Sequence, residues 1–372
     1  MRVLLLSTSF RLEGPANTFI HIARYSRSAG IDLMAGALAG RGPAEAIYRK
    51  LGVPTVYFGR PGVAGMGIAS RLRRFLSSEG VDVVCCQLLR GEVVGALATR
   101  DLSTCRVVCV VQNEDPYRIL TKNPPKALLS RWALGRAARV VAVSRSLADF
   151  ITQHQRVPPE SVTVVPNAVD PAKFPTRAAA SRPQDLPAGG PLLGCVGRLA
   201  PQKGQRILIS AFHRLVRSLP DASLLLVGDG PNRQALARLA DRGAGASRIH
   251  LTGWKRSVGP YLPFLDVYVQ PSMWEGMPFA TLEAMASGVA VVASSVGGLS
   301  EILGNECGVL VPPGNDVALA DAILKLLCDD EARTAMARSG RRRVHSHYRA
   351  DQMATAYFRL FGQVASEAPR SS

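Results

Sequence analysis

The sequence has few of the features that mark membrane-spanning, secreted or nucleic-acid-binding proteins. No run approaches the roughly 18 apolar residues that a membrane span needs, and the opening MRVLLL is too short for a signal-peptide core. Aromatic residues make up only 6% of the chain and are not interleaved with arginines, which argues against stacking on bases. We therefore expect a cytoplasmic protein, at most peripheral at the inner face of the membrane, with no nucleic-acid partner.

The seven cysteines form no recognisable metal or disulfide pattern. Most of them lie within apolar runs, and no CxxC pair is accompanied by a second pair or by a histidine cluster. Buried free thiols in a reducing compartment explain them better than disulfides or zinc. The chain also lacks an Asp-x-Asp pair, so neither a metal ion nor another cofactor is expected.

Acidic residues are scarce relative to basic ones, and the formal net charge is +17. Such an excess favours an anionic partner, for example a diphosphate substrate or a membrane surface. Helix-period basic segments at 71–75 and 341–343 could lie against anionic lipid, or they could be solvated cationic faces.

Short apolar runs alternate with longer helical patterns along almost the whole chain. This alternation is typical of parallel sheets covered by helices, and the runs are too uniformly apolar for a sheet with one wet face. The predicted strands are 3–6, 33–38, 53–58, 81–86, 106–111, 140–143 and 162–165 in the first half, and 192–196, 223–227, 249–252, 267–270, 289–293 and 308–311 in the second.

The length and the two similar series of strands predict two domains. We expect a first Rossmann-like domain at 1–170, an interdomain linker at 171–190, a second Rossmann-like domain at 191–346, and a final helix and tail at 347–372. The linker is proposed because this stretch is rich in Pro, Gly and Ala and poor in strand and helix signals. The fold class is α/β, with the two domains facing each other across a cleft.

The segment at 271–283, PSMWEGMPFATLE, is the most informative part of the chain. It joins a predicted strand to a helix, so Glu275 lies in the turn and Glu283 lies about two turns into the helix. In α/β proteins, ligands bind beyond the carboxyl ends of the strands, and the N–H groups at a helix start attract anions or hydroxyls. Two carboxylates beside such donors suit sugar and ribose hydroxyls.

The loop after the predicted strand 192–196 carries Arg198 and Lys203. Two cations on a strand-to-helix crossover can neutralise a diphosphate. The spacing matches neither a P-loop nor a GxGxxG motif, so solvated surface cations are the alternative. At the first such crossover, Gly14 would allow the backbone to approach a ligand closely, although an ordinary turn explains it equally well.

With these residues laid out, the chain resembles the retaining nucleotide-sugar glycosyltransferases of family 4, which have the GT-B fold. The resemblance covers nearly the whole chain and is strongest from 140 to 311. Its marks are VPNAVD at 165–170, Gly197-Arg198 with Lys203-Gly204, VGDGP at 227–231, Glu275 with Glu283, EAMASG at 283–288, VGG at 296–298 and GVLVPPG at 308–314.

The resemblance implies a role for each site residue. Arg198 and Lys203 would hold the donor diphosphate and stabilise the departing negative charge, and Glu283 would bind the ribose hydroxyls. The donor sugar would be held by Glu275 and by the backbone of Gly276, Met277 and Phe279. The final helix would cross back onto the first domain, and retention would follow from front-face attack helped by the donor phosphate.

Two departures concern the first domain. The Gly-Gly loop of the family is Gly14-Pro15 here, which removes one backbone donor from the donor-binding loop. Many members also have a histidine after the fifth strand, where this chain has Gln112 followed by Asn113. Glutamine can hydrogen-bond a sugar hydroxyl but cannot titrate near neutrality. Gln112 and Asn113 are the candidate acceptor-side residues, with Glu114 and Asp115 as alternatives to Asn113.

The leading hypothesis is a retaining hexosyltransferase that moves a sugar from a UDP- or GDP-sugar to a glycan or lipid-linked acceptor. Assembly of cell-surface polysaccharide or lipopolysaccharide, at an anionic membrane surface, fits the basic composition. A nucleotide-sugar epimerase of the same fold and a non-catalytic nucleotide-sugar-binding protein are the alternatives.

Overall fold

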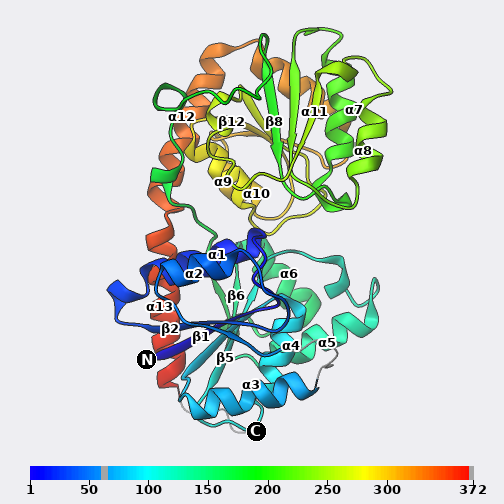
Figure 1. Ribbon diagram of the computed structural model, residues 1–372. Coiled ribbons are helices and arrows are strands. Elements are labelled where there is room, and N and C mark those ends of the chain that lie inside the picture. The colour runs from blue at the N-terminus through cyan, green and yellow to red at the C-terminus, as the bar shows by residue number, and fades with distance from the viewer. Residues whose placement is uncertain (60–65, 368–372) are drawn as a thin grey trace. The chain divides into compact units, whose positions relative to one another are not determined.

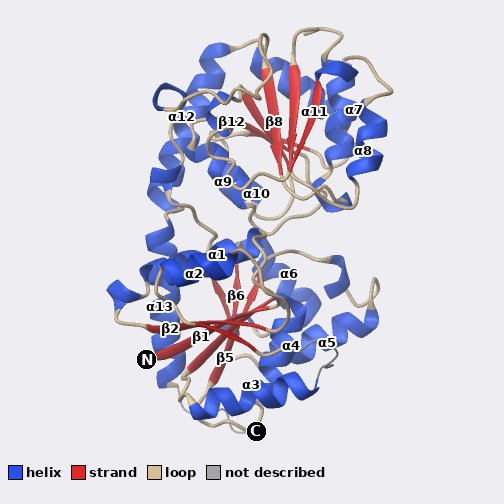
Figure 2. Ribbon diagram, in the orientation of Figure 1, coloured by secondary structure: helices blue, strands red, loops and turns tan. Residues whose placement is uncertain are grey.

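The computed structural model describes residues 1–59 and 66–367, and these form two units. One unit contains residues 1–167 together with the C-terminal segment that begins at Ala350, and the other contains Ala168–Arg349. Each is a parallel sheet covered by helices (Figures 1 and 2). The predicted α/β class with two Rossmann-like sheets is confirmed, whereas the cleft between the domains stays a prediction.

The first unit is built on a sheet of seven described strands in the order β3-β2-β1-β4-β5-β6-β7, all parallel. The strands are β1 (Arg2–Ser7), β2 (Asp32–Ala37), β3 (Thr55–Tyr57), β4 (Val83–Gln87), β5 (Arg106–Val111), β6 (Arg139–Ala142) and β7 (Val162–Val164). The helices that connect them are α1 (Gly14–Tyr25), α2 (Ala44–Lys50), α3 (Met66–Ser78), α4 (Leu88–Thr99), α5 (Pro124–Gly135) and α6 (Arg145–Gln155).

The second unit repeats this plan with six described strands in the order β10-β9-β8-β11-β12-β13. They are β8 (Leu192–Val196), β9 (Ser223–Val227), β10 (Ile249–Gly253), β11 (Val267–Gln270), β12 (Ala290–Ser294) and β13 (Val309–Val311). Its helices are α7 (Gln205–Leu215), α8 (Arg233–Ala240), α9 (Phe279–Ala286), α10 (Leu299–Leu303), α11 (Asp316–Leu327) and α12 (Asp330–His347). Every apolar run predicted to be a strand overlaps one.

The strand order places a switch point in each sheet. Chain order reverses between β1 and β4 in the first unit and between β8 and β11 in the second. Beyond the carboxyl ends of such a strand pair the two following loops diverge to opposite sides, which opens a crevice for ligands. The loops after β8 and β11 are the ones that carry Arg198, Lys203 and Glu275.

The last helix, α13 (Ala350–Ser366), belongs to the first unit, as the family resemblance implied. It packs against α1, and the side chains of Tyr357 and Phe361 are fully buried. Beyond its end, the carboxylate of Glu367 accepts a hydrogen bond from Arg139 at 2.5 Å.

The segment at 171–190, expected to be an interdomain linker, instead belongs to the second unit. Polar side chains attach it there: Asp185 pairs with Lys255 at 2.8 Å, and Arg177 pairs with Asp266 at 3.2 Å. Its Leu186 side chain is buried. The local composition favoured a free linker. The partners in these contacts lie 70 to 90 positions further along the chain, so the sequence of the segment itself does not reveal them.

A buried ion pair holds the segment between β5 and α5 in place. The guanidinium of Arg118, in the short turn η2 (Pro116–Arg118), donates to both carboxylate oxygens of Glu92 on α4, at 3.1 and 2.7 Å. It also donates to Ser130 on α5, and its backbone oxygen accepts from Gln155 on α6. Four segments of the first unit are therefore joined through one arginine that is 1% exposed.

Removing one partner of this pair should be costly because it leaves the other charge buried and unpaired. We expect Arg118→Met to lower the free energy of unfolding by about 3–5 kcal/mol, measured by urea denaturation. The double variant Arg118→Met with Glu92→Met should lose clearly less. Arg214→Met, which breaks the more exposed pair with Asp316, should cost at most about 1 kcal/mol. Equal losses in the two single variants would contradict this account.

Candidate functional site

The candidate site begins with the carboxylate of Glu275 in the loop after β11. Its side chain is 1% exposed, and its Oε1 accepts three hydrogen bonds. The donors are Lys203 Nζ at 2.5 Å, Ser272 Oγ at 2.7 Å and Gln270 Nε2 at 3.3 Å. A buried carboxylate requires such compensation, because removal from water otherwise disfavours its charged form.

The side chains beneath Glu275 form a directed chain of hydrogen bonds. The hydroxyl of Tyr268 donates to Gln270 Oε1 at 2.6 Å, which turns the amide nitrogen toward Ser272 at 2.8 Å and toward Glu275. Burial raises the pKa of Tyr268 well above its ordinary value, so the phenol keeps the proton that it donates. The orientation of the carboxylate is thus fixed from the strand outward.

Lys203 reaches Glu275 because the two loops approach closely. Lys203 ends the short turn η6 (Pro201–Lys203), and Gly204 follows with φ +64°. A Cβ on Gly204 would lie 1.9 Å from the backbone oxygen of Pro271, so only glycine fits this contact. Helix α7 begins after it, at Gln205.

Arg198 lies earlier on the same loop, with an exposed side chain. Its backbone is fixed, since its carbonyl oxygen accepts from Gln205 Nε2 at 2.9 Å. Its guanidinium forms no ion pair with any residue in the described part of the chain. The structure therefore brings both predicted cations onto the loop after β8, with Lys203 bound to Glu275 and Arg198 exposed.

The remaining predicted donor-side residues follow Glu275 directly. Gly276, Met277 and Phe279 are buried at the start of α9, and the oxygen of Gly276 accepts from the N–H of Gly298 at 2.8 Å. Glu283 lies one turn into α9, not two, because the helix begins at Phe279. Burial raises the pKa of its half-buried carboxyl to about 7.

In the first unit, Gln112 is part of a closed ring of buried side chains. Its Nε2 donates to Thr18 Oγ1 at 3.1 Å, Thr18 donates to Asn167 Oδ1 at 3.0 Å, and Asn167 Nδ2 donates to Gln112 Oε1 at 3.1 Å. The ring therefore connects the residue after β5, helix α1 and Asn167, the last residue of the 1–167 segment. Gln112 is 7% exposed. Asn113 is half-buried, and Gly14 is the exposed first residue of α1.

Sequence reasoning missed a hollow at the switch point of the first sheet. It is lined by residues at the ends of β1 and β4 and in the segments that follow them, among them Ser7, Thr8, Arg11, Gln87 and Leu88. Among the residues that the structure describes, the buried atoms Thr8 Oγ1 and Gln87 Oε1 have no hydrogen-bond partner, although Gln87 Nε2 donates to Ser7 Oγ at 3.2 Å. Leu88 has φ +64°, a strained conformation for leucine. The feature of the sequence that could have indicated this hollow is Gln87, a polar residue directly after the apolar run 81–86.

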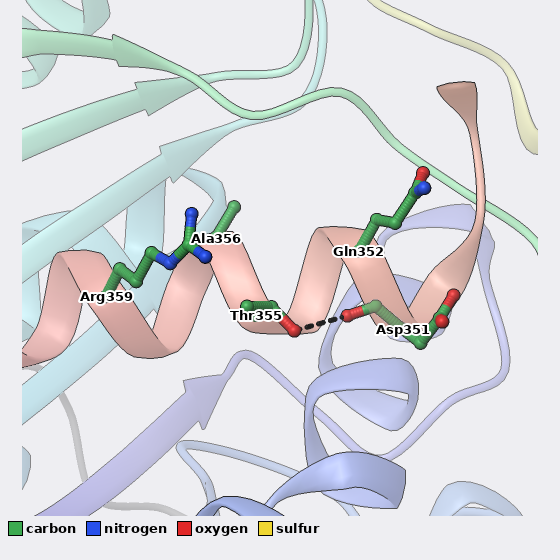
Figure 3. Close-up of a pocket in the computed structure, with 5 residues that line it drawn as sticks. All are labelled: Asp351, Gln352, Thr355, Ala356 and Arg359. Atoms are coloured by element: carbon green, nitrogen blue, oxygen red, sulfur yellow. Dashed lines mark hydrogen bonds between the residues drawn. The ribbon is translucent and has the colours of Figure 1, made fainter. Parts of the chain in front are cut away.

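A second hollow runs along α13 and is lined by Asp351, Gln352, Thr355, Ala356 and Arg359. Figure 3 shows that these residues all come from one helix and that the Thr355 hydroxyl is bonded to the backbone oxygen of Asp351. Since Thr355 is bonded to its own helix, this hollow has a weaker claim to ligand binding than the switch point.

Two family models match the chain. Glycosyltransferase Family 4 matches residues 12–173, and Glycosyl transferases group 1 matches residues 190–329. The two matches leave 1–11, 174–189 and 330–372 uncovered, and the second contains all of the predicted site residues from Arg198 to Glu283.

Curated relatives are similar over part or most of their length. A 2-deoxystreptamine glucosyltransferase of Streptomyces kanamyceticus is 31% identical over 59% of this chain and 59% of that protein. A UDP-Gal:alpha-D-GlcNAc-diphosphoundecaprenol alpha-1,3-galactosyltransferase of Escherichia coli is 27% identical over 80% of this chain and 79% of the relative. The lipopolysaccharide core biosynthesis glycosyltransferase LpsE of Rhizobium meliloti is 31% identical over 47% and 51%. The chain thus spans between about half and four fifths of these relatives.

Solved structures share the fold over nearly the whole chain. HepE from Anabaena in complex with UDP has a TM-score of 0.83 at 20% identity, with 98% of this chain and 100% of that chain covered. Sucrose-phosphate synthase from Thermosynechococcus elongatus has a TM-score of 0.83 at 20% identity, covering 98% and 99%. The chain therefore belongs to the group 1, family 4 glycosyltransferases and has their GT-B fold.

Proposed function

We propose that this protein is a retaining glycosyltransferase that moves a hexose from a UDP- or GDP-sugar to a glycan or lipid-linked acceptor. The observation that carries the proposal is the Lys203–Glu275 pair at the switch point of the second sheet, with the exposed Arg198 on the same loop. The galactosyltransferase and LpsE among the relatives support a role in assembling cell-surface polysaccharide or lipopolysaccharide.

The donor side works by charge. Lys203 and Arg198 would neutralise the diphosphate and stabilise the negative charge that grows as it leaves. Glu275 holds Lys203 in place and would accept hydrogen bonds from the donor sugar, together with the backbone of Gly276, Met277 and Phe279. Since these cations meet the leaving group directly, we propose that transfer needs no metal ion and no other cofactor.

We assign acceptor binding to the first unit. The ring of hydrogen bonds around Gln112 changes the role that we expect for this residue. Each end of the Gln112 amide already makes one hydrogen bond in this ring, and the residue is 7% exposed, so we assign it a supporting role rather than direct acceptor binding. Gln87 and Thr8 each offer a buried unpaired oxygen to an acceptor hydroxyl. Neither Gln87 nor Gln112 can take a proton near neutrality. The donor phosphate would therefore deprotonate the attacking hydroxyl, and this corresponds to front-face attack with retention of configuration.

The donor assignment is tested with a panel of UDP-, GDP- and ADP-sugars, by thermal shift and by release of nucleotide without acceptor. Stabilisation by one donor with slow hydrolysis is expected. A product of unchanged mass would indicate an epimerase, and stabilisation without turnover on any acceptor would indicate a binding protein. No shift with any donor would overturn the proposed site.

Substitutions at the charged pair should remove donor turnover while the fold persists. Glu275→Gln keeps a hydrogen-bonding side chain, and Lys203→Met keeps most of the side-chain volume. Each should lower acceptor-free hydrolysis about 10²–10³-fold, the effect of losing one preorganised charge-stabilising group. Lys255→Met removes a lysine from the Asp185 pair in the same unit and serves as the matched control. Full hydrolysis in both site variants would contradict the assignment.

Glu283 should make stability depend on pH. Between pH 4.5 and about 7 the folded protein retains a proton that the unfolded chain has released, so this group's contribution to stability falls as pH rises through that window. Glu283→Gln cannot titrate. Its free energy of unfolding relative to the parent should therefore increase from pH 5 to pH 8, measured by urea denaturation. A difference that stays constant over this range would contradict the raised pKa.

Gln87→Leu should affect the acceptor and spare the donor. Loss of one hydrogen bond of about 1–1.5 kcal/mol corresponds to about a tenfold rise in KM for the acceptor. The measurement is transfer to alkyl glycosides and alkyl-diphosphate glycosides, with acceptor-free donor hydrolysis as the internal control. A parallel fall in hydrolysis would mean that Gln87 serves the donor or the fold.

A further inference from the structure

Helix α5 presents large apolar side chains to solvent, in contrast to the described side chains of the other helices in the first unit. Leu120, just before the helix, is 40% exposed, and Leu128 and Leu129 on the helix are 52% and 43% exposed. Only eight large hydrophobic residues of the described chain are exposed, and three of them fall within these ten positions. Such a concentration marks an interaction surface rather than scattered exposure.

The exposed residues share one face of α5 because of their helical spacing. Pro125, Leu128, Leu129 and Trp132 recur at i, i+3, i+4 and i+7, and their face is exposed except for the half-buried Trp132. The opposite face, with Ala127, Ser130 and Leu134, is buried against the unit. Helix α5 lies beside α4 in Figure 1, and the two are in contact.

The orientation of this face is fixed by buried and capping contacts. The Asn123 side chain accepts from the N–H of Lys126 at the helix start, and Ser130 accepts from the buried Arg118. The apolar face is therefore held outward by the same arginine that joins α4, α5 and α6. A preorganised face can bind a flat surface without first ordering itself.

Exposed cations flank the apolar residues along the chain, in a stretch of sequence that has no acidic residue. Lys122, Lys126 and Arg136 are exposed, and the sequence from 116 to 148 contains no Asp or Glu. None of these three cations takes part in an ion pair within the described residues. Arg136 lies over the ring of Trp132 at 5.3 Å, which places a cation directly beside the apolar face.

The basic segments that the sequence suggested for lipid contact are used inside the fold. Arg71 donates to the oxygen of Phe58, and Arg73 donates to those of Leu97 and Ala98. Arg341 and Arg343 likewise donate to backbone oxygens. These four arginines stabilise neighbouring segments. The exposed Arg74 and Arg342 have no exposed apolar residue beside them in either stretch, so neither stretch is the favoured lipid-contacting surface.

We infer that the α5 face, defined as Leu120, Lys122, Lys126, Leu128, Leu129 and Trp132, docks on the surface of an anionic lipid bilayer. The leucines and Trp132 would enter the boundary between headgroups and acyl chains, while Lys122 and Lys126 meet the anionic headgroups. Among the described residues, no helix has the length and apolar character needed to cross a bilayer. The inference deepens the proposed function, because a lipid-linked acceptor would lie in that surface.

The experiment is co-sedimentation of the full chain with vesicles of phosphatidylcholine alone and with 30% phosphatidylglycerol, at about 50 and 300 mM salt. The parent should bind the anionic vesicles and release steeply with salt. Leu128→Ser with Leu129→Ser should weaken binding about tenfold or more, and Lys122→Ser with Lys126→Ser should weaken it similarly and flatten the salt dependence. The matched controls are Val317→Ser, another exposed apolar residue, and Arg238→Ser with Arg242→Ser, another exposed cationic pair.

Each alternative result has a definite meaning. No binding of the parent to anionic vesicles, or unchanged binding of both α5 variants, would overturn the inference. A parent that dimerises through the leucines and ignores lipid would also overturn it and identify the face as a contact between copies. Acceptor-free donor hydrolysis, measured in every variant, should stay at the parent level, so a failure of lipid docking is distinguishable from a failure of the proposed transferase activity.

Discussion

The buried carboxylate of Glu275 is the constraint around which the second unit is organised. A charged group that is 1% exposed must be matched by a cation and by hydrogen bonds. Lys203 supplies the charge, Ser272 and Gln270 supply the bonds, and Tyr268 fixes the amide below them. Gly204 lets the two loops approach closely enough for the pair to form. The same requirement that stabilises the loops brings a fixed cation to the switch point of the second sheet.

The two sheets use their switch points differently. In the second unit, the crevice between β8 and β11 carries charges suited to a diphosphate. In the first unit, the hollow between β1 and β4 is lined by Arg11 and Glu13 as well as by the neutral Thr8 and Gln87, each of which has a buried oxygen with no hydrogen-bond partner among the described residues. A fixed cation fits a leaving group whose charge grows, whereas neutral oxygens fit hydroxyls that donate protons in hydrogen bonds. This difference supports assigning the donor to the second unit and the acceptor to the first.

Buried polar groups also explain the arrangement of the first unit. The ring of Gln112, Thr18 and Asn167 joins a strand, a helix and the end of the unit. Arg118 joins α4, α5 and α6 through Glu92, Ser130 and Gln155. Such networks have strict geometry, because an unsatisfied buried charge is expensive, and the Arg118 network also fixes the outward face of α5.

The sequence by itself determined the α/β class, all of the described strands and the loop positions of Arg198, Lys203 and Glu275. Uniform apolar runs and family motifs are local signals that survive without tertiary context. Tertiary structure decided that residues 171–190 pack on the second unit, that Gln112 is occupied by Thr18 and Asn167, and that Gln87 borders a hollow. It also decided that exposed leucines lie on and beside α5, whereas most arginines of the segments 71–75 and 341–343 bond to backbone oxygens of the fold. These outcomes depend on pairs of residues far apart in the chain, whose burial and hydrogen bonding no local pattern encodes.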